Sequence, residues 1–237
     1  MKTASKPKFR KIDLSLKKLI GLCYATDELL QDSTALGGVI QEAFTSEFSF
    51  RTDDAILNGS GAGMPLGIIP SGALVSVAAE AGQASATINS LNIFKMWARL
   101  LPAAEKNAVW IVNKDVYPQL FSLNVAVGLG GIPVWLPAGS ISGQPYSTLF
   151  GKIVIPCEAS ATLGTVGDVI LADLGGYVLA EKGGIKSDMS IHVRYLYDES
   201  VFRFVLRIDG QPALASPITP FKGSSTLSHF VGLATRS

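Results

Sequence analysis

A long amphipathic helix constrains the fold of this sequence more than any other feature. Between residues 34 and 57, apolar side chains recur at spacings of three and four, as on a helix with one buried face. Such a helix is on the order of 35 Å long. Glu47 and Arg51 can pair across one turn, and glycine at Asn58-Gly59 suits a left-handed cap where the helix ends. The predicted apolar stripe contains Leu36, Val39, Ile40, Ala43, Phe44 and Phe48, with Phe44 buried between the helix and a sheet.

The segment before this helix carries a strand pattern and two helix-start signals. Residues 1–8 are polar and Lys-rich, which indicates a loose tail. From Phe9, apolar Ile12, Leu14 and Leu16 alternate with polar residues, which predicts a strand with one solvated face. Thr26-Asp27-Glu28 is typical of a helix start, and Ser33 offers a second N-cap.

The remainder predicts short strands, short helices and one long hairpin. No regular element can persist across the Gly- and Pro-rich residues 58–72. A helix is expected at residues 90–102 with Leu91, Phe94, Trp97, Ala98 and Leu101 facing the core, and Asn113-Lys114-Asp115 should open a helical turn before Pro118. The turn Asp198-Glu199-Ser200 should join strands 186–196 and 201–209 into an antiparallel hairpin. Further short strands are expected at 108–112, 132–136, 151–156, 168–172 and 176–180, and the mixture predicts an α+β fold.

The composition limits the classes of partner. Hydrophobic residues make up 48% of the chain and charged residues only 16%, so we expect a sizeable core and some surface buried against copies of the same chain. The net charge of +1 lacks the basic surplus of a dedicated nucleic-acid binder. No apolar run approaches the ~20 residues of a membrane span, and the N-terminus does not resemble a secretory signal. These features predict a protein made in a cytoplasm.

The residues that most often carry catalysis are scarce and scattered. His192 and His229 are the only histidines, and Cys23 and Cys157 lack metal-ligand spacing, so we interpret both pairs as structural, the cysteines as buried reduced thiols. The acidic pairs Asp53-Asp54 and Asp198-Glu199 fit solvated positions near a helix end and in a turn. Two carboxylates from separate loops can still meet in a cleft, which leaves a glycosidase-like hydrolase open.

Two glycine-containing segments resemble catalytic motifs without satisfying them. Gly59, Gly61 and Gly63 follow a helix and precede Met64-Pro65, whereas a phosphate-binding loop follows a strand and carries a Lys. Residues 139–143, GSISG, place Ile141 where a hydrolase elbow needs serine, and we predict a turn there. No catalytic, cofactor-binding or metal-binding residue is predicted, and no cofactor.

The order of these segments resembles the major capsid proteins of tailed bacteriophages, which have the Hong Kong 97 type of fold. The first half carries a basic strand at residues 9–19, then TDELLQDS at 26–33, then the long helix ending in DDAILNGSGAGMPLGI at 53–68. In the second half, residues 143–145, 151–154 and 167–173 resemble the strands of the axial domain. Residues 177–185 and 198–213 resemble the peripheral hairpin, with its D-x-x-x-F-R-x-x-x-R-x-D-G pattern.

The resemblance implies how the chain is divided and what it lacks. Residues 1–25 would be a tail and the returning strand of an extended loop, 26–85 and 183–212 a peripheral lobe around the spine helix, and 86–182 and 213–237 an axial lobe of helices around a central sheet. The family's N-terminal arm and the outward half of its extended loop are not matched, so we expect weak association into rings rather than closed shells. No cross-linking residues are carried over, since residues 185–210 contain no Asn.

The function implied is structural rather than enzymatic. The subunit would associate with itself into hexamers and pentamers that tile an icosahedral shell around double-stranded DNA, contacting the DNA only non-specifically. Scaffold, portal or a maturation protease would be further partners, with no membrane partner, and the location would be the virion after assembly in the host bacterial cytoplasm. The alternatives are an encapsulin-like nanocompartment shell and, from a different class, a β-rich carboxylate-dependent hydrolase.

Overall fold

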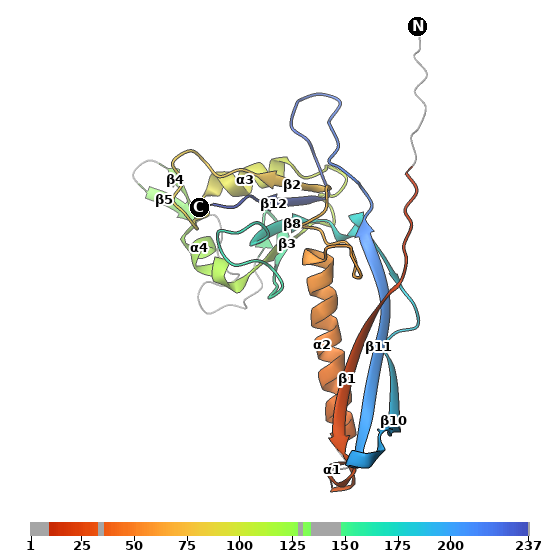
Figure 1. The fold of residues 1–237 in the computed structure, drawn as a ribbon. Helices are drawn as coiled ribbons and strands as arrows, with labels where there is room; N and C mark the ends of the chain where they lie inside the picture. The colour runs from red at the N-terminus through yellow and green to blue at the C-terminus, as the bar shows by residue number, and fades with distance from the viewer. Residues whose placement is uncertain (1–9, 33–35, 128–129, 134–147, 237) are drawn as a thin grey trace.

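The computed structural model describes residues 10–32, 36–127, 130–133 and 148–236. They form a long arm, in which a helix lies along extended strands, and a compact lobe of short strands and helices beside one end of the arm (Figure 1). Helices and strands are mixed without regular alternation, which confirms the predicted α+β class.

The arm is built on a four-stranded antiparallel sheet with β11 in its centre. β1 follows one edge of β11, from Lys17 opposite Ile208 to Thr26 opposite Glu199. On the other edge, β10 pairs with the first half of β11 and β9 pairs with its end. The short helix α1 (Asp27–Asp32) lies at the tip of the arm (Figure 1). The strands are β1 (Lys17–Thr26), β9 (Tyr177–Glu181), β10 (Lys186–Arg194) and β11 (Glu199–Pro212).

The first strand lies later in the chain than predicted, because its partner edge is occupied. The strand expected from Phe9 begins only at Lys17. Beyond Ile208, the edge of β11 is taken by the Gly-rich passage, where the Leu66 amide donates to the Gly210 carbonyl over 2.8 Å. Residues 10–16 therefore have no strand to pair with, although the Ser15 amide donates to the Asp209 carboxylate over 2.6 Å.

The predicted hairpin is present, with a turn three residues earlier than expected. Residues 195–197 form a 3-10 turn, and Asp198 adopts a left-handed conformation with φ of 53°. Glu199 and Ser200, expected in the turn, already belong to β11. The two aromatic residues of the turn and Leu196 are exposed, so local hydrogen bonding rather than burial shapes this end of the hairpin.

The long helix α2 (Leu36–Asn58) confirms the predicted helix of residues 34–57, and its Glu47–Arg51 pair is formed at 2.8 Å. The helix start at Thr26 is also confirmed by α1, whereas the second N-cap, Ser33, lies outside the described residues. Burial differs from the prediction: Phe48 and Leu57 are buried, but Phe44 is only half-buried. The reason is that α2 packs on a narrow sheet, and no second layer from the described residues covers its outer side.

The helix ends as predicted, but glycine is needed there for a different reason. Gly59 does not have a positive φ, so it is not a left-handed cap. A Cβ at this position would meet the carbonyl oxygens of Ala55 and Pro65. Gly59 therefore serves close approach of the backbone, because the loop folds back onto the helix end: the Gly67 amide donates to the Gly59 carbonyl over 2.7 Å.

The compact lobe has a six-stranded mixed sheet in the order β2-β12-β8-β3-β7-β6. Two neighbour pairs, β12 with β2 and β3 with β7, are parallel, and the others are antiparallel. The strands are β2 (Leu74–Val77), β3 (Val109–Val112), β6 (Thr148–Leu149), β7 (Lys152–Pro156), β8 (Val169–Ala172) and β12 (Phe230–Leu233). A separate hairpin joins β4 (Asn124–Val127) to β5 (Gly130–Pro133), and residues 134–136 of the predicted strand 132–136 lie outside the described residues.

The helices α3 (Ser90–Ala98) and α4 (Tyr117–Ser122) pack on this sheet. The predicted inward face of α3 is only partly correct: Trp97 is half-buried against the core, but Leu91 is 53% exposed, and the buried side chains include Ile93 and Met96. The helix was expected to continue to residue 102, but α3 ends at Ala98. The residues that follow it form a β-bridge with Ser228 beside β12. The predicted turn at Asn113 is confirmed, since its side chain accepts from the Asp115 amide over 3.0 Å.

Three clusters of buried side chains hold the molecule together. One fills the compact lobe around Trp110, and one lies in the arm where Phe48 meets Phe204. The third includes Leu57, Ile68 and Phe230 and joins the end of α2 to the six-stranded sheet. Arm and lobe are therefore connected by a continuous apolar junction.

Candidate assembly surfaces

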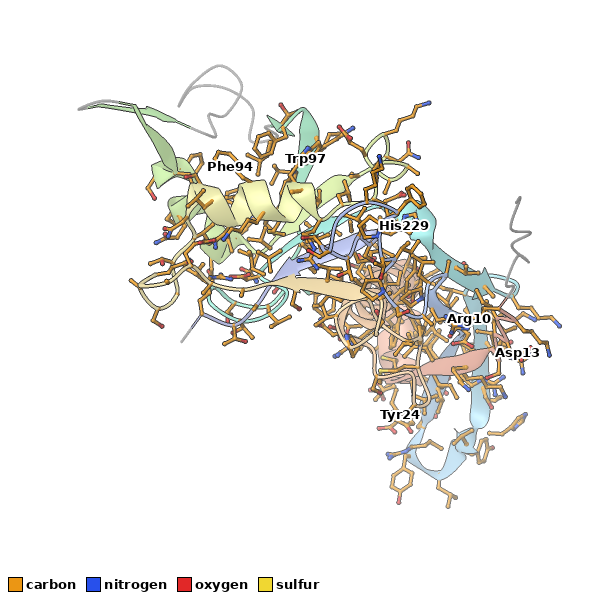
Figure 2. All side chains as sticks on the ribbon, turned by 90° about the horizontal axis from the view of Figure 1, so that it is seen from above. Arg10, Asp13, Tyr24, Phe94, Trp97 and His229 are labelled. Carbon is orange, nitrogen blue, oxygen red and sulfur yellow. The ribbon has the colours of Figure 1, made fainter. Side chains whose placement is uncertain are left out.

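The two histidines lie in different environments. His192 is exposed on β10. His229 lies at the junction of arm and lobe (Figure 2), with Nδ1 3.0 Å from the Asp173 carboxylate, which also accepts from the Gly175 amide. A Cβ on Gly176 would overlap the His229 ring, so this pair positions the turn after β8 against the start of β12.

The cysteines differ from the prediction in their burial. Cys23 on β1 and Cys157 after β7 are unpaired and half-buried rather than buried. Cys157 packs at the margin of the cluster that joins α2 to the six-stranded sheet. Within the described residues, no group of three or more His, Cys, Asp or Glu side chains is arranged to hold a metal ion.

The acidic pairs were assigned to solvated positions, and most of their partners are local. Asp54 accepts from the Asn58 side chain over 2.8 Å, and Glu199 pairs with Arg194 at 3.1 Å. Partial burial raises the pKa of the Asp53 carboxyl. Asp53 and Glu181 line one shallow groove whose walls are largely apolar, so two carboxylates from separate elements do share a groove, as the hydrolase alternative requires.

The glycine-rich passage connects elements of the arm. Gly61 and Gly63 have φ of 80° and 77°, and the Gly61 amide donates to the Pro65 carbonyl over 3.2 Å. The Tyr177 hydroxyl donates to the Leu66 carbonyl over 2.9 Å, and burial together with the nearby Asp209 carboxylate raises the pKa of Tyr177 to about 12. The passage thus fastens α2 to β9 and β11. The other glycine-containing segment, residues 139–143, lies outside the described residues.

Sequence reasoning missed a buried ion pair in the compact lobe. Arg236 and Asp168 pair within the lobe with almost no exposure, and Asp168 also accepts from the Gly164 and Val169 amides. Arg236 donates in addition to the carbonyls of Thr87 and Ala234. No local pattern marks this pair, because its members are 68 positions apart.

Large exposed apolar side chains concentrate on the arm. α2 covers one face of the sheet, and we name the opposite face, defined by Lys18, Ile20, Leu22, Tyr24, Arg203, Val205 and Arg207, the outer sheet face. Ile20 and Leu22 are 54% and 53% exposed there, and Leu196 at the hairpin turn is 92% exposed. Large exposed apolar side chains on a charge-poor chain indicate surfaces that other molecules cover.

One signal for this face was present in the sequence. Residues 17–26 are apolar at both odd and even positions, with Leu19 and Cys23 on one side and Ile20 and Leu22 on the other. A strand with two apolar faces has to be buried on both sides, and α2 packs against only one of them. Among the described residues, no helix is long and apolar enough to cross a membrane.

The whole arrangement matches solved capsid structures. The alignment with the capsid of the empty GTA particle has a TM-score of 0.73 at 17% identity and covers 95% of this chain and 75% of that one. For Microbacterium phage Oxtober96 the TM-score is 0.63 at 14% identity, covering 93% and 73%. The SrpI encapsulin of Synechococcus elongatus gives 0.60 at 10% identity, covering 92% and 73%. At these identities the likeness establishes the Hong Kong 97 type of fold.

The family itself comes from the sequence comparison. No curated protein sequence matches the chain. The profile of the phage capsid family matches residues 1–223, which include the whole arm and most of the compact lobe. The chain belongs to the phage capsid family, and it is a structural subunit of the major capsid shell.

Proposed function

We propose that this subunit forms rings of five and six copies that tile an icosahedral shell around double-stranded DNA. The observation that carries the proposal is the family match over residues 1–223, combined with a long arm and compact lobe of the Hong Kong 97 type. Identical subunits with complementary, non-identical edges close into rings. Contact with DNA would be non-specific, since the chain has a net charge of only +1.

The two lobes would serve different contacts in such a ring. We assign residues 17–72 and 177–212 to the peripheral lobe and residues 73–176 and 213–236 to the axial lobe, which packs around the ring axis. This division departs from the one expected from the sequence, because β2 lies in the six-stranded sheet and β9 pairs with β11. Scaffold, portal and maturation protease are the further partners proposed, with assembly in the host cytoplasm and the virion as final location.

Sedimentation across a concentration series, followed by electron microscopy, tests this function. The expected result is a concentration-dependent increase in mass from monomers to rings of five or six copies, or to shells built from them. A compact two-fold dimer, or a monomer at every concentration and salt tested, would contradict the proposal. A shell that recruits a specific protein cargo through its inner surface would support the encapsulin alternative instead.

We also propose that the subunit has no enzymatic activity. Family and fold point to a structural role. The hydrolase alternative rests on Asp53 and Glu181 in one groove, with the pKa of Asp53 raised by burial. Assays on ester, glycoside and phosphate substrates should show no turnover, and metal analysis should find no stoichiometric ion. Turnover that is abolished by Asp53→Asn, in a variant that still folds, would establish the hydrolase.

A further inference from the structure

The outer sheet face carries a concentration of unpaired cations. Lys18, Lys182, Lys186, Arg203 and Arg207 line one groove on this face, together with a single carboxylate, Asp188. Arg203 pairs with Asp188 at 2.7 Å. For the other four cations, no carboxylate lies within ion-pair distance among the described residues.

The placement of these cations is unfavourable for an isolated subunit. Lys18 on β1 lies directly opposite Arg207 on β11, and like charges at directly paired positions destabilise a sheet. The Lys182 amide donates to the Arg207 carbonyl over 3.0 Å, which brings a third cation to the same end of the face. With a net charge of +1, the chain has nearly as many carboxylates as cations and could give each of these cations a partner. Their concentration on one face without carboxylates therefore indicates that an external partner supplies the negative charge.

The chemistry of the surrounding side chains favours a protein partner over nucleic acid. Ile20 and Leu22 stand beside the cations and are more than half exposed. Aliphatic side chains gain from burial against other apolar groups, whereas a phosphate backbone offers them nothing. The partner should therefore present carboxylates next to small or apolar side chains.

The helix layer on the opposite side of the same arm has this character. Residues 27–58 contain seven carboxylates and a single cation, Arg51, which is already paired with Glu47. Glu42 lines a shallow groove of polar side chains on α2, and Val39 and Phe50 of the same helix are exposed apolar side chains. The acidic residues of this layer whose side chains the structure describes are Asp27, Glu28, Glu42, Glu47, Asp53 and Asp54.

We infer that the outer sheet face of one subunit receives the acidic helix layer of a second copy. The two surfaces are different and complementary, and they lie on opposite sides of one arm, so the contact is head-to-tail and repeats from copy to copy around a ring. The inference rests on the proposed self-assembly and specifies which surfaces of the arm meet. It also explains how a chain with little net charge can hold two strongly charged faces.

Paired charge reversals test this contact in the full chain. Variant A carries Lys18→Glu and Arg207→Glu, and variant B carries Glu42→Lys and Glu47→Lys. All four positions are exposed, so both variants should keep the wild-type circular dichroism spectrum. In sedimentation velocity at moderate salt, each variant alone should associate at least about tenfold more weakly than the wild type. Their equimolar mixture should recover association, because A and B then present matching faces to each other.

Two controls separate this contact from a general charge effect. Arg10→Glu with Lys11→Glu changes the charge by the same amount at exposed positions before β1, outside both proposed surfaces, and should leave association near the wild-type level. The variant with all four arm reversals in one chain should associate like the wild type. Loss of association that neither the mixture nor the four-fold variant restores would overturn the inference, as would full association of A and B alone.

The remaining outcomes distinguish the partner and the underlying function. If variant A assembles normally but loses retardation of a double-stranded DNA fragment that the wild type binds, the face is a nucleic-acid contact and the inference is wrong. If the wild type itself stays monomeric under all conditions, the proposed self-assembly fails together with the inference. If the wild type assembles and the reversals change nothing, only the inference fails.

Discussion

The ring of Phe44 on α2 stacks on the ring of Phe204 on β11, with centroids 4.4 Å apart and planes inclined by 14°. This contact joins the spine-like helix to the central strand of the arm. Phe48, one turn further, packs on the same strand, and its ring lies 6.4 Å from that of Phe44. In the part of the chain that the structure describes, no other helix lies on this face, so the rigidity of the arm depends on a short row of aromatic contacts.

Truncation of Phe44 should destabilise the arm measurably. Phe44→Ala is expected to lower the free energy of unfolding by about 2 kcal/mol, less than the roughly 3–5 kcal/mol of a fully buried phenylalanine, because this side chain is half-buried. Gln41→Ala, on the exposed side of the same helix, should change it by less than about 0.5 kcal/mol. Urea denaturation of both variants measures the difference, and equal effects would mean that the core face of α2 is misassigned.

The close packing beneath Phe44 makes Gly21 sensitive to enlargement. A Cβ at Gly21 on β1 would lie 2.5 Å from Cε1 of Phe44, so Gly21→Ala should cost about 1–3 kcal/mol. Gly37→Ala is the matched control, since nothing lies within 4 Å of a Cβ there and the position is helical. That variant should gain up to about 1 kcal/mol from helix propensity. Thermal unfolding should therefore shift in opposite directions, and a shared direction would exclude the packing explanation.

The buried ion pair should be costly to break from one side. Asp168→Ala leaves the Arg236 guanidinium buried without its carboxylate and removes the acceptor of two backbone amides, so we expect a loss of about 3–5 kcal/mol or failure to fold. Arg236→Met should cost less, because the Asp168 carboxylate keeps both amide donors. Comparison of soluble yield and denaturation midpoints tests this order, and a milder effect of Asp168→Ala would refute it.

Tyr177 should make the stability of the chain depend on alkaline pH. Burial and the Asp209 carboxylate raise the pKa of Tyr177 to about 12 from an ordinary value of 10.0. The folded state therefore retains the proton more strongly than the unfolded state, so this contribution is fully present below pH 10 and is lost as the pH rises towards 12. Tyr177→Phe should be less stable by about 1 kcal/mol at pH 8, where the hydrogen bond to Leu66 is lost.

The pH series distinguishes the titration of Tyr177 from that of the other tyrosines. Denaturation of wild type and Tyr177→Phe at intervals from pH 8 to pH 11.5 gives the difference in unfolding free energy, in which the other tyrosines cancel. That difference should shrink as the pH rises above 10. A constant difference across the range would show that the pKa of Tyr177 is the same in the folded and unfolded states.

Elements whose signal is local could be predicted from the sequence. The long helix ends within a residue of its predicted C-terminus because its periodicity and the Asn58-Gly59 stop both lie within the segment itself. The hairpin of β10 and β11 was predictable for the same reason, from two alternating runs joined by a short connection. The order of these elements along the chain was sufficient for the resemblance to phage capsid proteins.

The sequence by itself therefore determined the α+β class, the long helix, the hairpin and the family. Only the tertiary structure decided where β1 begins, which side of α3 is buried, how far Phe44 is covered, and that Asp168 meets Arg236. Each of these depends on a partner distant in the chain: Leu66 occupies the edge of β11, Ser228 ends α3, and one narrow sheet lies under α2. Periodicity shows which side chains should be buried, but the residues that bury them are determined only when the whole chain folds.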